Sequence, residues 1–480
     1  MEPRILDAEP VTSLADYITA GGGRGLDAAR RLGPIGIIDH VEASGLRGRG
    51  GAGFTTGLKW RTVAENLSAT VPPTVVVNAA EGEPGTFKDR AILRRNPYKV
   101  LEGALVAAMA IGADRVILAL KASFSTEVTR VRSAIAEVRG SDWADGLELA
   151  IVEGPSHYLY GEETALLEVV AGRAPFPRIA PPFRHGVDEV GADTVSAAQV
   201  TMAGPANSTP APPTLVNNVE TLANVPGILA QGPDWYRTQG TPESPGTIVC
   251  TITGHTRRHG VAEFAMGTPL DEVIEAVGGG PHPGTKVMAA MSGVANPLLP
   301  ETLLHTPLTY EAMEEAGGGL GSAGFIVFDD TTDLAAVAAG VSRFLAVESC
   351  GQCTPCKQDG RAIATLLDHL RASTSDRQSL EVVSDKLATV ADGARCYLAI
   401  QHQRVVGSVL ALFPEQLQAH VVGELGEAAP ELIAPILDLH DGRAVLDEGH
   451  WEKQLDWTSE EVDSGQAPAD RIDQRAPDSA

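Results

Sequence analysis

Four cysteines, three of them in one short segment, constrain the fold of this chain more than any other feature. Cys350, Cys353 and Cys356 form C-x2-C-x2-C within SCGQCTPC, and Cys396 follows 40 positions later. Both positions lie at junctions between expected helices, so a compact fold can bring the fourth thiol to the other three. Three thiolates from one tight loop and one from a distant element satisfy the ligand requirement of a four-iron cluster.

Zinc is the main alternative metal for these four thiols. It also accepts four thiolates, but its usual spacing pairs one C-x2-C with a second C-x2-C rather than with a lone cysteine. The spacing therefore favours a [4Fe-4S] cluster, with zinc and a redox switch as alternatives. Cys250 stands inside an expected strand and is interpreted as a buried thiol. Five cysteines in 480 residues are too few for an oxidised secreted framework.

Charge and length narrow the class of protein. A chain of 480 residues suggests roughly three domains. Its 37 basic and 62 acidic residues give a net charge of −25, which repels nucleic acids and anionic membrane surfaces and favours a basic protein partner. No apolar stretch is long enough to span a bilayer, and the start MEPRILDAEP does not resemble a signal peptide. We therefore expect a cytoplasmic protein without nucleic-acid binding or direct membrane insertion.

The pattern after Pro73 predicts an α/β domain. The expected strands are 74–77, 115–120 and 148–152, and the expected helices are about 98–112, 125–139 and 161–172. Apolar strands separated by helices indicate a parallel sheet that is covered on both faces. Eight prolines after Arg173 predict a long surface loop of about forty residues.

Two further domains and a tail are expected after this loop. Short β-rich pieces at about 245–330, with one helix near 268–277, predict a compact second domain. Four amphipathic helices between Thr331 and about Gly423 predict a helical bundle. We expect domain boundaries at 1–240, 241–330, 331–424 and 425–480, with disorder beyond about Trp457.

A glycine-rich segment, SGLRGRGGAGFTTGLKW at 44–60, is a candidate phosphate site. Gly48, Gly50 and Gly53 match G-x-G-x-x-G, but the preceding segment is helical in pattern, so an ordinary Rossmann turn is not expected. Exposed amides beside two arginines and Lys59 can hold a phosphate. A tight turn without a ligand is the alternative.

Carboxylates follow two of the expected strands. Asn78, Glu81 and Glu83 come directly after TVVV, at the end of a parallel strand where open α/β sheets bind ligands. Glu162 and Glu163 follow the strand ELAIV and open a helix. The alternative for both pairs is capping of the next turn or helix. The later segment NNVET offers two amides and a threonine on an expected loop.

The order of these segments resembles a known family. Five blocks within about residues 40–420, GLRGRGGAGF, NAAEGEPGTFKDR, YLYGEETALLE, LVNNVETLANVP and ESCGQCTPC with the later cysteine, resemble the NADH-binding flavoprotein (the F subunit) of bacterial NADH-quinone oxidoreductase (complex I). Related diaphorase subunits occur in NAD-linked hydrogenases and formate dehydrogenases. The resemblance implies a Rossmann-like FMN/NADH domain, a β-grasp domain of the soluble ligand-binding type and a four-helix bundle with a [4Fe-4S] cluster.

The resemblance also implies roles for individual residues. Those expected around FMN are Gly48, Gly50, Gly51, Gly53, Lys59, Asn78, Glu81, Tyr158, Gly161, Glu162, Asn217, Asn218 and Thr221. Those expected at NADH are Phe54 and Phe183 against the adenine, and Glu83 and Glu163 at the ribose and nicotinamide end. The expected cluster ligands are Cys350, Cys353, Cys356 and Cys396. The chain departs from the family at Ala80 (usually aspartate), Ala180 (often lysine), Thr62 (often aromatic) and Thr55 (proline).

The implied function is that of an NADH dehydrogenase (diaphorase) subunit. NADH would pass a hydride to FMN and the cluster would take the electrons singly, so no catalytic side chain is required. The implied partners are a thioredoxin-like [2Fe-2S] subunit and a larger iron–sulfur or catalytic subunit, which could hold the protein at the inner face of the membrane. Two alternatives remain: a non-catalytic electron-transfer or scaffold subunit, motivated by Ala80 and Ala180, and a zinc-organised interaction module.

Overall fold

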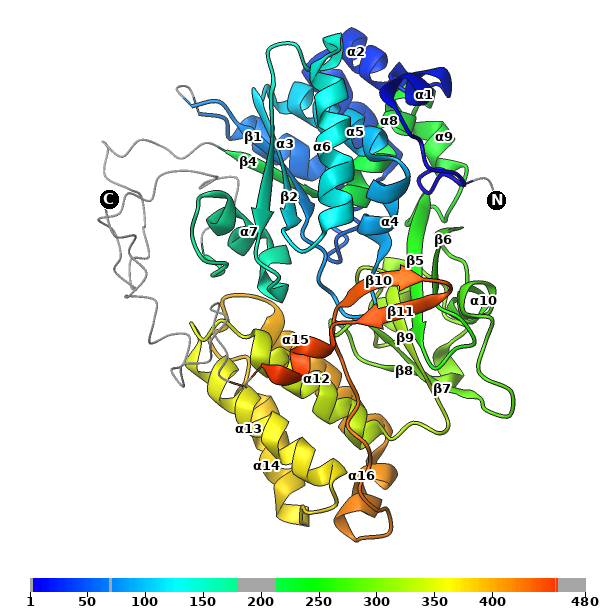
Figure 1. Cartoon of the computed structure of the whole chain (residues 1–480), viewed down its shortest axis with the longest axis vertical. Helices are drawn as coiled ribbons and strands as arrows, with labels where there is room; N and C mark the ends of the chain where they lie inside the picture. Colours follow the sequence, from blue (N-terminus) through cyan, green and yellow to red (C-terminus); the bar gives the residue numbers. More distant parts are fainter. Residues whose placement is uncertain (1–2, 69–70, 180–212, 454, 456–480) are drawn as a thin grey trace, which may run out of the picture.

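The computed structural model describes residues 3–68, 71–179, 213–453 and 455 (Figure 1). In this view an α/β part occupies the upper half, a helical bundle the lower left and a β-rich part the lower right. Ala180, Phe183, most of the proline-rich loop after Arg173 and the tail from Trp457 onward lie outside the described residues. Within the described residues, no helix combines the length and the apolar character that a bilayer span requires.

The α/β part is built on a four-stranded, all-parallel sheet in the order β3-β2-β1-β4. Its strands are β1 (Thr74–Ala79), β2 (Arg115–Lys121), β3 (Glu148–Gly154) and β4 (Thr214–Asn218). Its helices are α1 (Leu14–Thr19), α2 (Arg24–Ser44), α3 (Thr56–Glu65), α4 (Lys88–Arg95), α5 (Pro97–Ile111), α6 (Ser125–Arg139), α7 (Glu163–Val170), α8 (Val219–Gln231) and α9 (Pro233–Arg237). The predicted covered parallel sheet is confirmed.

The strands alternate between two apolar cores, as the two-residue period of a strand requires. Val75 and Val77 of β1 face the larger core, to which α2, α5 and α8 contribute. Val76 faces a smaller core that includes Leu166 and Leu167 of α7. Both faces of the sheet are therefore covered at β1 and β2, which explains the consecutive apolar residues of these strands.

The expectation of a loop at NNVET is wrong. β4 pairs in parallel with β1, with Val216 opposite Val76, and Asn218 is the N-cap of α8. The apolar part of this strand is short and directly follows prolines, so its sequence signal is weak. Burial beside β1 supplies the stabilisation that local pattern does not show. α8 also contains Pro226, which its packing against α2 and α5 tolerates.

The β-rich part has a five-stranded mixed sheet in the order β6-β5-β9-β7-β8. Its strands are β5 (Thr247–Gly254), β6 (Gly260–Ala265), β7 (Val287–Ser292), β8 (Leu299–Pro300) and β9 (Gly324–Asp329). The predicted helix near 268–277 is present as α10 (Leu270–Val273), followed by a π-helical turn (Ile274–Gly278), and α11 (Tyr310–Glu315) was not predicted. Cys250 is fully buried in β5, as expected.

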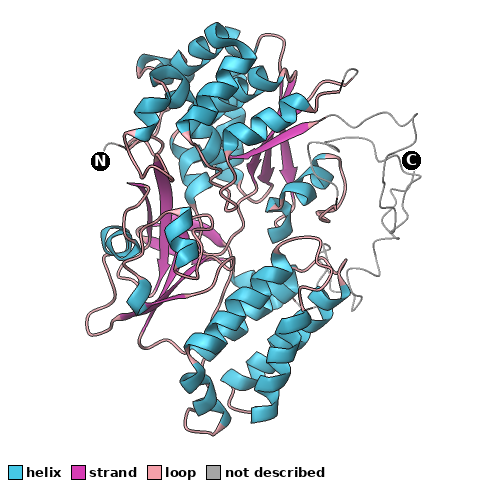
Figure 2. Ribbon diagram, turned by 180° about the vertical axis from the view of Figure 1, so that it is seen from behind, coloured by secondary structure: helices cyan, strands magenta, loops and turns pink. Residues whose placement is uncertain are grey.

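The helical bundle and the C-terminal segment complete the fold. The four predicted helices are α12 (Leu334–Glu348), α13 (Thr354–Arg371), α14 (Arg377–Thr389) and α15 (Leu398–Leu412), and a short fifth helix, α16 (Pro414–Val421), was not predicted. After the bundle the chain forms a hairpin of β10 (Ile436–His440) and β11 (Arg443–Leu446) and a short 3₁₀ helix (Glu448–Glu452). Figure 1 shows the hairpin between the α/β part and the β-rich part, and Figure 2 shows the bundle from behind.

Candidate functional site

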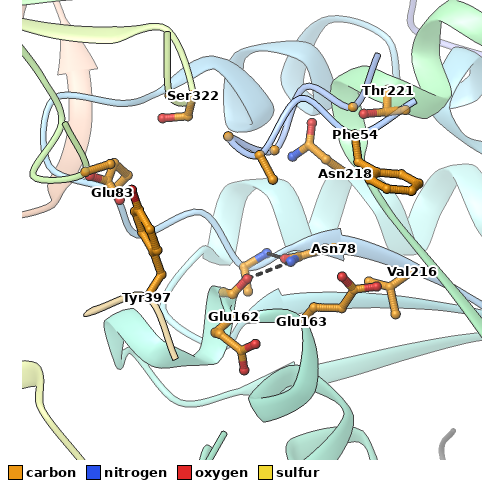
Figure 3. A pocket seen from close by; sticks show the side chains of 18 of the residues that line it. Phe54, Asn78, Glu83, Glu162, Glu163, Val216, Asn218, Thr221, Ser322 and Tyr397 are labelled. Atoms are coloured by element: carbon orange, nitrogen blue, oxygen red, sulfur yellow. Dashed lines mark hydrogen bonds between the residues drawn. The ribbon is translucent and has the colours of Figure 1, made fainter. Parts of the chain in front are cut away.

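A cavity of about 920 Å³ lies at the carboxyl ends of β1 and β4 (Figure 3). These strands are neighbours at the point where the strand order reverses, which is where open α/β sheets bind ligands. Every described residue that the sequence assigned to FMN or NADH lines this cavity: Gly48, Gly50, Gly51, Gly53, Phe54, Lys59, Asn78, Glu81, Glu83, Tyr158, Gly161, Glu162, Glu163, Asn217, Asn218 and Thr221. Their contacts with bound cofactors stay predictions.

The glycine loop presents bare backbone to the cavity. Among the described residues, the N–H groups of Gly50, Gly51, Ala52 and Gly53 have no hydrogen-bond partner. Gly51 has a φ of 122°, and a Cβ there would approach other atoms only at 3.9 Å or more. The loop therefore has the unpaired donors and the open space that a phosphate group requires.

Hydrogen bonds fix the asparagines at the strand ends. The Asn78 amide donates to the carbonyl oxygen of Gly161 at 2.8 Å, the interaction drawn in Figure 3. The indole N–H of Trp60 donates to Asn217 Oδ1 at 2.8 Å. The side-chain oxygen of Asn218, Oδ1, accepts a hydrogen bond from the backbone N–H of Glu220 at 3.0 Å and so caps α8. These polar groups are thus oriented before any ligand binds, which lowers the entropic cost of binding.

Five carboxylates line the cavity, and each is compensated by the protein. Glu81 pairs with Arg90 at 2.9 Å, Asp89 with Lys88 at 2.8 Å and Glu163 with Lys59 at 2.6 Å. Glu162 accepts hydrogen bonds from the first backbone N–H groups of α7, so the capping interpretation holds for its side chain. Glu81 also accepts from Asp89 N in the first turn of α4. A phosphate-bearing ligand therefore does not meet five free negative charges.

Glu83 is compensated differently. It is partly buried, and its carboxylate accepts hydrogen bonds from the Tyr158 hydroxyl at 2.5 Å and from the Val294 N–H at 2.6 Å. Burial raises the pKa of Glu83 to about 7, and the two hydrogen bonds oppose this rise. Tyr158 in turn accepts from the Gln401 amide at 2.8 Å. Glu83 thus changes charge near neutral pH at the junction of all three parts of the chain.

A buried ionic network supports the floor of the cavity. The Lys88 ammonium lies 2.8 Å from Asp89, 2.9 Å from Glu220 and 3.1 Å from Asn218 Oδ1. Burial opposes its charge, but Asp89 and Glu220 outweigh burial and raise the pKa of Lys88. The network connects α4, β4 and α8 beneath the glycine loop, where Arg49 N–H donates to Thr221 Oγ1 at 2.8 Å.

The four predicted cluster ligands surround a second, small void. Its other lining residues are mainly apolar and include Leu159, Pro177, Leu398 and Ala399. Burial raises the pKa of Cys350 and Cys396, and it raises that of Cys356 to about 11. A metal cluster must displace these protons on binding. The donor set consists of two thiols from the loop before α13, one from the first turn of α13 and one from the loop before α15, in an apolar setting, and it fits a [4Fe-4S] cluster.

The two cavities share a wall. Cys396 lines both of them, and Tyr397, Leu398 and Gln401 beside it also line the larger cavity. Sequence reasoning missed these three residues, although their position next to the fourth cysteine was a usable signal. It also missed Asn296 and Ser322, which the β-rich part contributes opposite the glycine loop and which carried no local signal.

The departures from the family pattern also reach the cavity. Ala80 and Thr62 line it, and Ala80 is 1% exposed and contributes only a methyl group where the family has a carboxylate. Thr55 is the N-cap residue of α3 and lies outside the lining. Phe54 is 53% exposed, which suits an aromatic ring that waits for a stacking partner.

Three known families match different parts of the chain. The Nuo51 FMN-binding domain family matches residues 41–227, and the NADH-ubiquinone oxidoreductase-F iron-sulfur binding region matches residues 336–420. The SLBB domain family matches residues 249–295. The glycine loop, the strand ends and all four cysteines fall within the first two matches.

Two relatives and one solved structure extend the similarity over most of the chain. The NADH-quinone oxidoreductase F subunit 2 of Rhizobium meliloti (strain 1021) is 37% identical over 411 residues, which cover 82% of this chain and 92% of the relative. The NADH-quinone oxidoreductase F subunit of Rickettsia typhi (strain ATCC VR-144 / Wilmington) is 39% identical over 67% of this chain and 74% of its own. A chain of the NAD+-reducing [NiFe]-hydrogenase in the H2-reduced state matches with a TM-score of 0.72 and 32% identity, over 86% of this chain and 67% of that chain. The chain belongs to the family of the NADH-quinone oxidoreductase F subunits, the FMN- and [4Fe-4S]-dependent NADH oxidoreductases.

Proposed function

We propose that this chain is the electron-entry unit of a larger redox assembly, where it oxidises NADH and passes the electrons to its own iron–sulfur cluster. One observation carries the proposal: Cys396 lies in the wall of both the large cavity and the cysteine-lined void. A flavin in the first cavity is therefore next to a cluster in the second. Neither the comparisons nor the compensated, open cavity supports the non-catalytic alternative.

The residues of the chain bind and orient rather than react. FMN supplies the acceptance of a hydride from NADH and the release of its electrons one at a time. The free N–H groups at 50–53 and the partly exposed Lys59 ammonium hold the phosphate of the flavin. The oriented asparagines at the ends of β1 and β4 contact its ring and ribityl chain. Phe54 stacks on the adenine of NADH, and Glu163 contacts its ribose. Cys350, Cys353, Cys356 and Cys396 hold the cluster.

We further propose how the chain is divided and assembled. Its parts correspond to the ranges 1–240, 241–330, 331–424 and 425–480, and its partners are a thioredoxin-like [2Fe-2S] subunit and a larger iron–sulfur or catalytic subunit. The net charge of −25 favours partners with basic contact surfaces, because opposite charges accelerate encounter. The assembly is cytoplasmic and reaches the inner face of the membrane only through its partners.

Anaerobic purification with native partners tests the proposal. The expected result is a preparation with FMN, four irons and acid-labile sulfide per chain, in which NADH bleaches the flavin absorption and basic redox subunits co-purify. A preparation with stoichiometric cluster but no flavin, and no absorbance change on adding NADH, would contradict it. The Lys59→Met variant should retain the cluster and bind FMN more weakly, since a charge-assisted hydrogen bond is worth about 1.5–3 kcal/mol.

The pKa of Glu83 makes a pH-dependent prediction. In the folded chain this pKa is about 7, above the ordinary 4.5, so folding favours the protonated carboxyl. The contribution of Glu83 to stability is therefore full below about pH 4.5 and is lost as the pH rises through 7.

The KM for NADH should change with an apparent pKa near 7, because the charge of a residue at the nicotinamide end changes there. Steady-state kinetics between about pH 5.5 and 8.5 would show this change in KM. The Glu83→Gln variant should have a KM that does not change with pH in this range. An unchanged pH dependence in Glu83→Gln would assign it to another group.

A further inference from the structure

The C-terminal segment 431–453 lies beyond the family matches but touches every part of the fold. Arg94 of α4 pairs with Asp438 at 2.7 Å, and the backbone N–H of Ala444 donates to His259 of the β-rich part at 2.9 Å. Arg343 of α12 donates to the carbonyl oxygen of Trp451 at 3.0 Å. In Figure 1 the chain rises from α16 along the bundle to the hairpin, and the red 3₁₀ helix that follows the hairpin lies at the upper end of the bundle, near the labels of α12 and α15.

The segment reaches a buried carboxylate between the two proposed cofactor sites. Glu348 is the last residue of α12 and stands two positions before Cys350. One of its oxygens lies 3.2 Å from His450 Nε2 and 3.3 Å from Lys453 Nζ, and the other accepts the Tyr158 N–H at 2.9 Å. A single side chain thus contacts the C-terminal segment and the wall of the flavin cavity, and it precedes the cysteine loop.

Glu348 is in an unfavourable place for a negative charge. Its side chain is 2% exposed, and it lies at the C-terminal end of a helix, where the partial charge of the helix is also negative. A buried charge persists only when opposite charges and hydrogen bonds compensate it. The Lys453 ammonium pairs with Glu348 and the His450 ring nitrogen lies within hydrogen-bond distance of it, while His157 and Lys121 also interact with it electrostatically. The His450 ring stacks on Phe344, 5.0 Å between centroids.

A second contact from the same segment reaches the cavity independently. The carbonyl oxygen of Ile436 accepts from Arg90 at 2.6 Å, and Arg90 pairs with Glu81 in the cavity wall at 2.9 Å. The Arg90 guanidinium lies between the rings of Phe87 and Phe124, at 4.1 and 4.5 Å from their centroids. The C-terminal segment therefore braces two different positions of the wall, through two buried charges.

We propose that His450 and Lys453 are positioning residues: by compensating Glu348 they hold Tyr158 of the flavin cavity and the loop that begins at Cys350 in one fixed arrangement. The inference rests on the proposed binding of FMN in the cavity. It means that the C-terminal segment fixes the position of the flavin site relative to the cluster site.

The test is a charge-rescue experiment on the full chain with its cluster. Lys453→Met leaves Glu348 under-compensated, so the dissociation constant of FMN, measured by flavin fluorescence, should rise by about tenfold. Hydrogen exchange should accelerate together at 156–161 and 349–356, and the EPR line shape of the reduced cluster should broaden. Adding Glu348→Gln removes the buried charge but keeps an acceptor for Tyr158, so the double variant should return to within about threefold of the original constant. The Lys453→Arg variant keeps a cation beside Glu348, so its dissociation constant for FMN should also stay within about threefold of the original.

The matched control is Lys386→Met, which removes a different ion pair of the bundle. Lys386 pairs with Asp359 at 3.0 Å, and neither residue lines a cavity. It should leave FMN affinity and exchange at both segments unchanged. The inference is overturned if Lys453→Met behaves like this control, or if Glu348→Gln fails to rescue it. Should Lys453→Met fail to fold, the same comparison is made with His450→Gln, alone and combined with Glu348→Gln. Failure of the unsubstituted chain to bind FMN would instead contradict the proposed function.

Discussion

Replacing Cys396 by serine is expected to separate NADH oxidation from electron delivery. The hydroxyl is a poor substitute for a thiolate ligand, so the variant should lose the EPR signal of the reduced [4Fe-4S] cluster. FMN should still bind, because the glycine loop and the strand ends do not depend on this sulfur. Transfer from NADH to the partner subunits should fall by more than about 100-fold, since changes even to groups around metal ligands cost 10–100-fold.

Two measurements on the Cys396→Ser variant separate the steps. NADH-dependent reduction of ferricyanide, which can take electrons from the flavin directly, should persist, whereas reduction through the native partners should not. The matched control is Cys250→Ala, which removes the buried thiol of β5 that lines neither cavity. An intact cluster signal in Cys396→Ser, or its loss in Cys250→Ala, would show that the ligand assignment is wrong.

Replacing Lys88 by methionine is expected to have the largest effect on stability. The substitution leaves the carboxylates of Asp89 and Glu220 buried without the ammonium that lies 2.8 and 2.9 Å from them. Breaking a buried pair by removing one partner typically costs about 3–5 kcal/mol. Asn218 also loses the donor to its carbonyl, so FMN affinity should fall with stability.

Thermal unfolding followed by flavin fluorescence measures the effect of Lys88→Met. The control is Lys386→Met in α14, whose pair with Asp359 at 3.0 Å is partly exposed. A pair of that kind contributes about 0–1 kcal/mol. Equal destabilisation by both substitutions would contradict the role of the buried network.

Local pattern predicted most of the fold because each predicted element carried its own signal. Strands β1, β2 and β3 each contain a run of consecutive apolar residues, and the bundle helices have a clear apolar face. The hairpin of β10 and β11 was not predicted although it has a local signal: Asp441 and Gly442 form a two-residue turn, with φ values of 48° and 71°, between two short apolar segments. Strand β4 has no comparable signal, because its stability depends on burial beside β1.

The candidate site was likewise predicted only in part. The glycines and the acidic residues were found because their types and their places after strands imply ligand binding. The reason for so many carboxylates could not be found, because their compensation depends on residues remote in sequence, such as Lys59 for Glu163. The shared wall at Cys396 was likewise invisible, since it requires the bundle to pack against the α/β part.

Stepwise anaerobic addition of NADH to the isolated chain, followed by EPR, tests the central claim most directly. If the flavin and cluster sites are adjacent as the cavities indicate, NADH alone should reduce the [4Fe-4S] cluster, and Phe54→Ala should raise the NADH concentration required. A cluster that dithionite reduces but that stays oxidised with excess NADH, in a preparation with full FMN content, would contradict the account.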